Sequence, residues 1–248
     1  MFLGVLLVLD VGNTDTVLGL FKGSILFFHK RVPSQKLKDF FLRKKIFFNH
    51  VDSAIVSSVV PAVDPLIRKM LQKLKIKKRI FVTHRLKLPI SLKVDRPGDV
   101  GADRLVNNSG AFVKYGGPLL VIDLGTATTI DYVDSKGAYR GGVIIPGLKI
   151  SAQALFERAS KLPSVPLEFS SKILGTNTVF QMQSGIVHGY IAMLEGMIRK
   201  IQKEIKKKPK IIMTGGLGSL VAPHVSFKNT LDPFLTLRGL KLLARLNA

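Results

Sequence analysis

Asp10-Val11-Gly12-Asn13-Thr14 and Asp123-Leu124-Gly125-Thr126 decide the fold of this chain, because they are two copies of one acidic-glycine turn. Each copy follows an apolar run, 5–9 in the first case and 119–122 in the second, and each precedes another strand-like run. Glycine lets a backbone approach an anion closely, and turn N–H groups beside small hydroxyl side chains hold phosphate. Two such turns facing each other would grip a nucleotide between related halves, so the pattern indicates a phosphotransferase.

The expected secondary structure repeats along the chain in the same order as the turns. Apolar spacing predicts first-half strands at 5–9, 16–22, 25–31, 53–59 and 79–83, with helices at 35–48, 62–75 and 103–115. In the second half it predicts strands at 119–123, 128–133, 138–145 and 210–214, with helices at 148–160, 177–205 and 237–246. We therefore expect an α/β protein of two βββαβαβα halves, residues 1–116 and 117–248, each with a mixed sheet.

Composition describes a globular protein that lacks thiol chemistry. The 248 residues are 46% hydrophobic and 22% charged, and they include no cysteine, which excludes disulfides, thiol catalysis and cysteine-bound metals. The apolar start at residues 1–9 has neither a basic region nor a cleavage site, and no apolar run reaches the roughly 18 residues that span a bilayer. We expect a soluble, cytoplasmic protein without a membrane partner.

The net charge of +22 favours anionic partners. One interpretation is a surface for nucleic acid or membranes. The other is a solvated surface that also attracts small phosphorylated substrates. Lysines gather at 36–45, 69–79 and 200–210, and the last two groups end predicted helices, where positive charge is favourable. We therefore favour the second interpretation and do not expect nucleic acid as the partner.

A third motif, Gly101-Ala102-Asp103-Arg104, closes a long segment without periodicity at 84–102. Asp103 has two interpretations. It is either the N-cap of the helix that follows or a general base toward a substrate hydroxyl, with Arg104 holding a carboxylate or phosphate. Spacing alone leaves both open.

Two common nucleotide-binding patterns are missing. Thr214-Gly215-Gly216-Leu217-Gly218 follows a strand but lacks the third glycine of a dinucleotide fingerprint, and the chain has no Gly-Lys pair for a Walker A loop. The five histidines show no ligand spacing, so zinc is not expected. A kinase of the P-loop class is excluded.

Taken together, the ordered motifs resemble type III pantothenate kinase, a family of the acetate kinase–sugar kinase–Hsp70–actin superfamily. The resemblance runs from about residue 5 to residue 240. Besides the three motifs above, it includes Gly141-Gly142, Pro146-Gly147, Asn177-Thr178, Met182-Gln183-Ser184-Gly185 and Thr214-Gly215-Gly216-Leu217.

The resemblance implies a duplicated ribonuclease H-like fold of the actin-like ATPase type and a homodimer. It also implies ATP-dependent phosphorylation of pantothenate to 4'-phosphopantothenate, the first step of coenzyme A biosynthesis. The family uses Mg2+ with the nucleotide and a monovalent cation, K+ or NH4+.

The resemblance also assigns roles to residues of this chain. Asp103 is the general base, and Gly101, Ala102, Arg104 and Thr178 join it in binding pantothenate, Thr178 from the partner-facing side. Asp123 contacts the monovalent cation, and Thr126 contacts ATP. The ATP phosphates are lined by Asp10, which is also near Mg2+, and by Val11, Gly12, Asn13, Thr14, Asp15, Thr16 and Val17.

Two positions depart from the family pattern and bear on substrate affinity. Val94 stands where the family usually has a substrate-contacting tyrosine, and Thr176 stands where it has a lysine. One alternative is therefore a superfamily kinase for another small hydroxy acid. A second alternative is a non-catalytic regulator or nucleic-acid-binding relative. The candidate catalytic carboxylates argue against it, because a chain without activity would be expected to have lost at least one of Asp10, Asp103 and Asp123, and all three are present.

Overall fold

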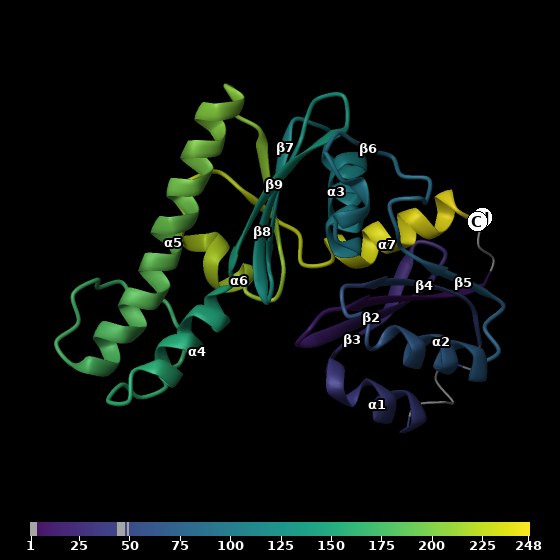
Figure 1. Cartoon of the computed structure of the whole chain (residues 1–248), viewed down its shortest axis with the longest axis horizontal. Helices are drawn as coiled ribbons and strands as arrows, with labels where there is room; N and C mark the ends of the chain where they lie inside the picture. The colour runs from purple at the N-terminus through teal and green to yellow at the C-terminus, as the bar shows by residue number, and fades with distance from the viewer. Residues whose placement is uncertain (1–3, 44–47, 49) are drawn as a thin grey trace. The chain divides into compact units, whose positions relative to one another are not determined.

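The computed structural model describes residues 4–43, 48 and 50–248. Contacts divide the chain into two compact units (Figure 1). The first contains residues 1–116, 137–139 and 234–248, and the second contains 117–136 and 140–233. No helix in the described part of the chain is both long and apolar enough to cross a membrane.

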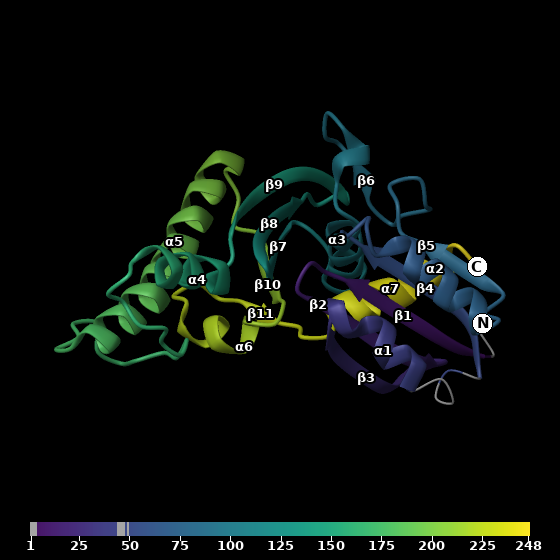
Figure 2. The same ribbon diagram turned by 60° about the horizontal axis from the view of Figure 1, so that its bottom comes forward.

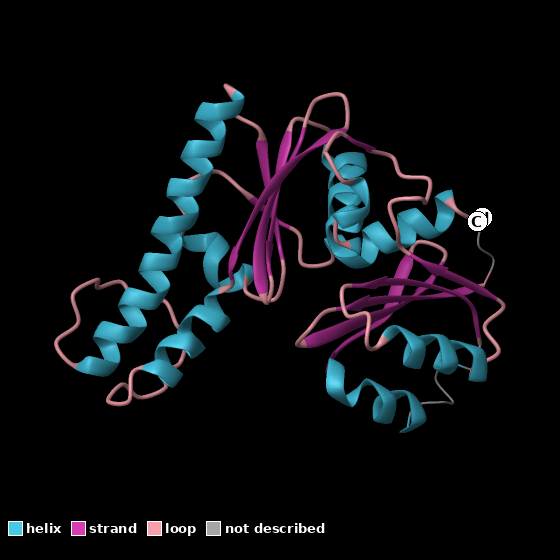
Figure 3. Ribbon diagram, in the orientation of Figure 1, coloured by secondary structure: helices cyan, strands magenta, loops and turns pink. Residues whose placement is uncertain are grey.

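The first unit is built on a five-stranded mixed sheet in the order β3-β2-β1-β4-β5 (Figure 3). The first three strands form antiparallel pairs, whereas β4 runs parallel to β1 and β5 runs parallel to β4. The bounds are β1 (Val5–Val11), β2 (Asp15–Lys22), β3 (Ile25–Pro33), β4 (Val51–Ser58) and β5 (Lys78–Phe81).

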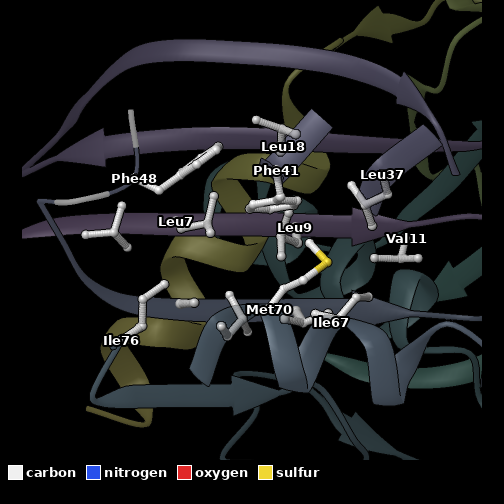
Figure 4. Close-up of a cluster of buried hydrophobic side chains, with 14 of the residues drawn as sticks. Leu7, Leu9, Val11, Leu18, Leu37, Phe41, Phe48, Ile67, Met70 and Ile76 are labelled. Carbon is white, nitrogen blue, oxygen red and sulfur yellow. The ribbon is translucent and has the colours of Figure 1, made fainter. Parts of the chain in front are cut away.

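Helices cover both faces of this sheet because the strand side chains alternate between faces. Leu7, Leu9 and Val11 pack in a cluster with Leu37 of α1 (Leu37–Arg43) and Ile67 of α2 (Asp64–Lys73), as Figure 4 shows. On the other face, β1 packs through Leu6 and Val8 against α3 (Ala102–Tyr115) and α7 (Leu235–Leu246).

The second sheet repeats this topology. Its order is β11-β10-β7-β8-β9-β6, in which β7 pairs antiparallel with β8 and parallel with β10. The strands are β7 (Leu119–Leu124), β8 (Ala127–Val133), β9 (Ala138–Pro146), β10 (Lys210–Thr214), β11 (Thr230–Leu231) and β6 (Ser91–Leu92). The helices of the second unit are α4 (Leu148–Arg158), α5 (Thr178–Ile205) and α6 (Gly218–Val221), and α4 contacts α5 (Figure 2).

Most predicted elements are confirmed, and the differences concern short or polar segments. The helix expected at 35–48 is shorter within the described residues: Ser34–Lys36 is a 3-10 turn, α1 ends at Arg43, and positions 44–47 lie outside the described residues. The two-residue strands β6 and β11 were not predicted, because two residues carry no periodicity. The turn at 135–137 is confirmed, and Gly137 adopts a φ of 78° there.

We propose that residues 1–116 and 117–248 are duplicated copies. Strands β1 to β5 correspond in order to β7 to β11 with β6 set aside, and α3 follows β5 as α7 follows β11. Compactness divides the chain differently, since α7 packs on α3 within the first unit. A Cβ at Gly110 would lie 3.0 Å from Cα of Gly239, so the two helix backbones approach each other closely.

Replacing Gly239 by alanine is expected to destabilise the protein by about 1–3 kcal/mol. The new Cβ would lie 2.5 Å from the backbone oxygen of Val106, so the α3–α7 pair must separate. Urea unfolding measures the effect. The matched control is Gly189→Ala on α5, where a Cβ meets nothing within 4 Å and a gain of about 0.5–1 kcal/mol is expected. Equal losses in both variants would show that the helix contact is unimportant.

Candidate functional site

The first acidic turn is held in shape by Ser34. Its backbone N–H donates to the oxygen of Thr14 at 3.0 Å, and its hydroxyl donates to the oxygen of Gly12 at 2.6 Å. The Thr16 hydroxyl lies 3.0 Å from the same Ser34 oxygen. Because the Ser34 proton is used on Gly12, the Thr16 hydroxyl is the donor of this bond. The connection between β1 and β2 is therefore held in place by Ser34, the first residue of the 3-10 turn that follows β3.

The expected ATP-binding stretch 10–17 separates into a reachable tip and a buried support. Asn13 and Thr14 are exposed at the tip, and Asp10 is half-buried at the end of β1. Thr16 is fully buried, so its hydroxyl supports the turn. The carboxylate of Asp15 lies 3.4 Å from the guanidinium of Arg31 on β3. The remaining members Val11, Gly12 and Val17 are buried, half-buried and half-buried, respectively.

The second acidic turn is closed against two glycines of its own unit. The Gly147 N–H donates to the oxygen of Thr126 at 3.2 Å. A Cβ at Gly215 would lie 2.5 Å from both Oδ1 of Asp123 and N of Leu124, and Gly215 also has a φ of 96°. Glycine at position 215 is therefore required by space and by backbone conformation.

Both turns carry the same buried threonine. Thr16 pairs with Val11 across the first hairpin, and Thr128 pairs with Leu124 across the second. Both threonines are fully buried. Thr128 is hydrogen-bonded to the hydroxyl of Tyr190 on α5, in the role that Ser34 plays for Thr16. Burial raises the pKa of Tyr190, as does the nearby negative charge of Asp123, while the bond to Thr128 lowers it.

The carboxylates of the two turns also share an environment. Asp10 pairs with Ser57 on the neighbouring parallel strand, and Asp123 pairs with Thr214 on its own neighbour. Both hydroxyl residues are buried. Each acidic side chain thus stands at the carboxyl end of a central strand beside a buried hydroxyl, which is where open α/β sheets bind ligands.

Replacing Tyr190 by phenylalanine is expected to cost about 1–3 kcal/mol of unfolding free energy, because the buried Thr128 hydroxyl loses its partner. The control Tyr132→Phe removes a half-buried hydroxyl that has no hydrogen-bond partner within the described residues, and it should change stability by under about 0.5 kcal/mol. Thermal or urea unfolding compares them. A neutral Tyr190→Phe would mean that the bond to Thr128 does not support the turn.

The third motif opens α3, but Asp103 is not its N-cap. The helix begins at Ala102, its N-cap is Gly101, and no side chain caps it. Asp103 instead lies in the first turn, where Oδ1 accepts from the N–H of Arg104 at 2.8 Å. A carboxylate there is favoured by the helix dipole. The Arg104 guanidinium carbon lies 5.8 Å from the centre of the Tyr139 ring.

A cavity of 540 Å³ lies in the first unit beside this motif. It is lined by Ser58, Val59, Pro61, Val82, Thr83, His84, Arg85, Gly98, Asp99, Val100, Gly101 and Ala102. Val59 connects it to the first turn, because its N–H donates to the oxygen of Val11 at 3.1 Å. A Cβ at Gly101 would lie 3.7 Å from Cγ1 of Val59. The volume falls in the range of about 300–1,000 Å³ typical of small-molecule sites.

The remaining predicted positions are not among the residues that line this cavity. Thr178 is the exposed first residue of α5, and the N-cap Asn177 accepts the N–H of Phe180 at 2.9 Å. Val94 is half-buried and Thr176 is exposed. Among the described residues, no three histidine, aspartate or glutamate side chains gather as a metal site. Mg2+ bound with nucleotide needs only one or two carboxylates besides the phosphates, so Asp10 fits that use.

Comparison with known proteins identifies the family. The model of the type III pantothenate kinase family matches residues 6–200. A curated type III pantothenate kinase from Geobacillus sp. (strain WCH70) is 42% identical over 250 residues, which cover 97% of each chain. The chain belongs to the type III pantothenate kinase family. Both findings cover the two acidic turns and the Gly101–Arg104 motif of this kinase.

Solved structures show the fold of the kinase. A putative Baf family transcriptional activator from Campylobacter jejuni matches with a TM-score of 0.64 at 18% identity, over 97% of this chain and 98% of that chain. MreB5 of Spiroplasma citri bound to ADP matches with a TM-score of 0.52 at 11% identity, over 98% and 96%. These similarities, with the two repeated sheets, confirm the duplicated ribonuclease H-like, actin-like fold.

Sequence reasoning missed several residues that build the candidate site. Ser34 and Tyr190 act through buried hydroxyls far along the chain from the turns, and no local pattern marks them. The segment at 84–102, which has no periodicity, contains His84 and Arg85. Its position directly after a predicted strand was the available signal, since ligands bind at carboxyl ends of parallel strands.

Proposed function

We propose that this kinase transfers the γ-phosphoryl group of ATP to the primary hydroxyl of pantothenate, giving 4'-phosphopantothenate for coenzyme A biosynthesis in the cytoplasm. The proposal rests on its 42% identity to a curated type III pantothenate kinase over 97% of each chain. The geometry supports it, because a cavity of suitable size lies beside Gly101 and Ala102, next to Asp103.

Asp103 is proposed as the general base of the reaction. It would accept the hydroxyl proton late in the transfer, while Gly101, Ala102 and Arg104 hold the substrate in line. Its position in the first turn of a helix whose other residues are mostly buried supports this role, since a base must be held within hydrogen-bond reach of the proton. The protein groups here position the substrate hydroxyl and neutralise charge on the phosphate, because phosphoryl transfer requires little covalent chemistry from the protein.

The two acidic turns are proposed to hold the nucleotide and its cations. The N–H groups of Asn13 and Thr14 and the hydroxyl of Thr14 would bind phosphate, with Thr126 as a second contact, while the Gly12 N–H closes the turn by donating to the oxygen of Asp15 at 3.0 Å. Asp10 would hold Mg2+, which offsets charge on the phosphate oxygens when bound. Asp123 would hold a monovalent cation, K+ or NH4+. The crowded, glycine-dependent packing around Asp123 supports a fixed carboxylate at this position.

We propose that the kinase is a homodimer that associates through the second unit. Large apolar side chains are exposed around α4 and the start of α5: Ile150, Leu155, Phe169, Ile173, Leu174 and Val179. Leu174 is 87% exposed, and exposed patches of this kind mark association surfaces. Thr178 lies within this stretch, consistent with a substrate contact across the interface. Leu174→Asp is expected to shift the mass measured by light scattering from dimer to monomer, and an unchanged mass would contradict this surface.

A panel of acceptors tests the proposed substrate. The kinase is expected to form a phosphorylated product, detected by mass spectrometry, with pantothenate and not with related small hydroxy acids. Val94 favours the alternative of a different hydroxy acid, because a half-buried valine offers no hydroxyl to a substrate. A better kcat/KM for another acid would support that alternative. DNA binding in salt titrations without ATP turnover would support a non-catalytic relative.

A further inference from the structure

The cavity of the first unit contains a positive charge that no part of the proposed mechanism uses. Its titratable lining side chains are His84, Arg85 and Asp99. In the part of the chain that the structure describes, neither the Arg85 guanidinium nor the His84 ring has a hydrogen-bond or ion-pair partner. Both residues line the cavity and are exposed to solvent, so the Arg85 guanidinium, which has no protein partner there, is available to a ligand.

The turn that carries His84 and Arg85 is held by hydrogen bonds of its own backbone. After β5, the N–H of Leu86 donates to the oxygen of Thr83 at 3.2 Å, and the N–H of Arg85 approaches the Thr83 hydroxyl at 3.4 Å. His84 lies over the opposite wall, since a Cβ at Gly98 would be 3.4 Å from its Cε1. The backbone of the turn is therefore held by its own hydrogen bonds, and the His84 ring lies close to Gly98.

We propose that Arg85, assisted by His84, recognises the carboxylate of the acceptor substrate and so determines its specificity. This proposal rests on the proposed function. Pantothenate carries one charge, a carboxylate, at the end opposite its reactive hydroxyl. Gly101 and Ala102 line the cavity next to Asp103, where the reactive hydroxyl would lie. Arg85 lines it from a different segment, the turn after β5, where the carboxylate would lie. Val59, Val82 and Val100 supply apolar wall for the methyl groups of the substrate.

Asp99 also lines the cavity, and its negative charge gives a second prediction of opposite sign. A substrate carboxylate is repelled by Asp99, so its binding requires the opposing charge of Arg85. Asp99→Asn is therefore expected to lower KM for pantothenate, the opposite sign to loss of Arg85. An increase in KM on loss of Asp99 would contradict the proposed placement of the carboxylate.

The test compares pantothenate with pantothenol, its neutral analogue with a hydroxymethyl group in place of the carboxylate. Arg85→Ala is expected to raise KM for pantothenate by about 10- to 100-fold with kcat within about twofold, and to leave kcat/KM for pantothenol within about threefold of wild type. Arg85→Lys should recover part of the loss, because it keeps the charge but not the fork of donors. The control is Lys87→Ala, which removes an exposed charge from the same segment outside the cavity lining. It should leave kcat/KM for both substrates unchanged.

Each outcome is decisive. Equal losses with both substrates, an equal loss in Lys87→Ala, or no loss in Arg85→Ala would overturn the role of Arg85. Calorimetric binding of pantothenate and pantothenol to the same variants gives a readout independent of turnover. A wild-type protein that turns over neither substrate would refute the proposed function instead, and the calorimetric comparison would still decide the carboxylate site.

Discussion

Asp103→Asn is expected to lower kcat by about 10²–10⁴-fold, the usual worth of a general base, with KM for both substrates nearly unchanged. Asparagine is nearly the same size and keeps an Oδ1 acceptor for the N–H of Arg104, so the start of α3 stays intact. What it loses is the ability to take the hydroxyl proton. Steady-state kinetics, with circular dichroism to show that the fold is kept, measures the effect.

The control for this variant is Asp95→Asn, an exposed carboxylate in the segment that leads to the same motif. It should retain full kcat. If Asp103→Asn kept a kcat close to wild type, Asp103 would not be the base. If the variant showed a raised KM for pantothenate with an unchanged kcat, the Asp103 carboxylate would bind the substrate without acting as the base.

Asp10→Asn is expected to lower kcat/KM for ATP by at least about 100-fold, because metal stabilisation of phosphate charge is worth several kcal/mol. Half-buried Asp10 is the last residue but one of β1 and pairs with buried Ser57, so an amide fits the same space without the charge. The loss should shrink as Mg2+ is raised, if the variant is limited by metal affinity. Kinetics over a range of Mg2+ concentrations tests this.

Asp39→Asn, on the exposed surface of α1, removes the same charge from the first unit away from the turn and is the matched control. An Asp10→Asn variant with unchanged ATP kinetics at every Mg2+ concentration would remove the first turn from the nucleotide site.

The fold was predictable because its strongest signals are local. The apolar runs before Asp10 and Asp123 are long enough to show strand character, and the glycines after them mark tight turns. The order of elements around both turns then pointed to duplication. The helix expected from residue 103 begins one residue earlier, at Ala102, and its cap is Gly101 rather than the candidate Asp103, because Gly101 caps it without a side chain.

The support of the site was not predictable, because it depends on contacts between distant segments. Nothing local distinguishes Ser34 from any other serine before a helix, yet it holds Gly12 and Thr14. Gly215 resembled an ordinary strand-to-helix glycine, whereas its lack of a side chain is what makes room for Asp123. The charge of Arg85 was one of 38 cationic side chains, and only the cavity singles it out.

The central claim is ATP-dependent phosphorylation of pantothenate, and ADP release by the wild-type protein tests it most directly. With ATP, Mg2+ and K+ present, we expect ADP to appear only when pantothenate is added, in equal amount to 4'-phosphopantothenate, and to fall sharply when K+ is omitted. ADP release that is absent, or that proceeds equally without pantothenate, would contradict the claim.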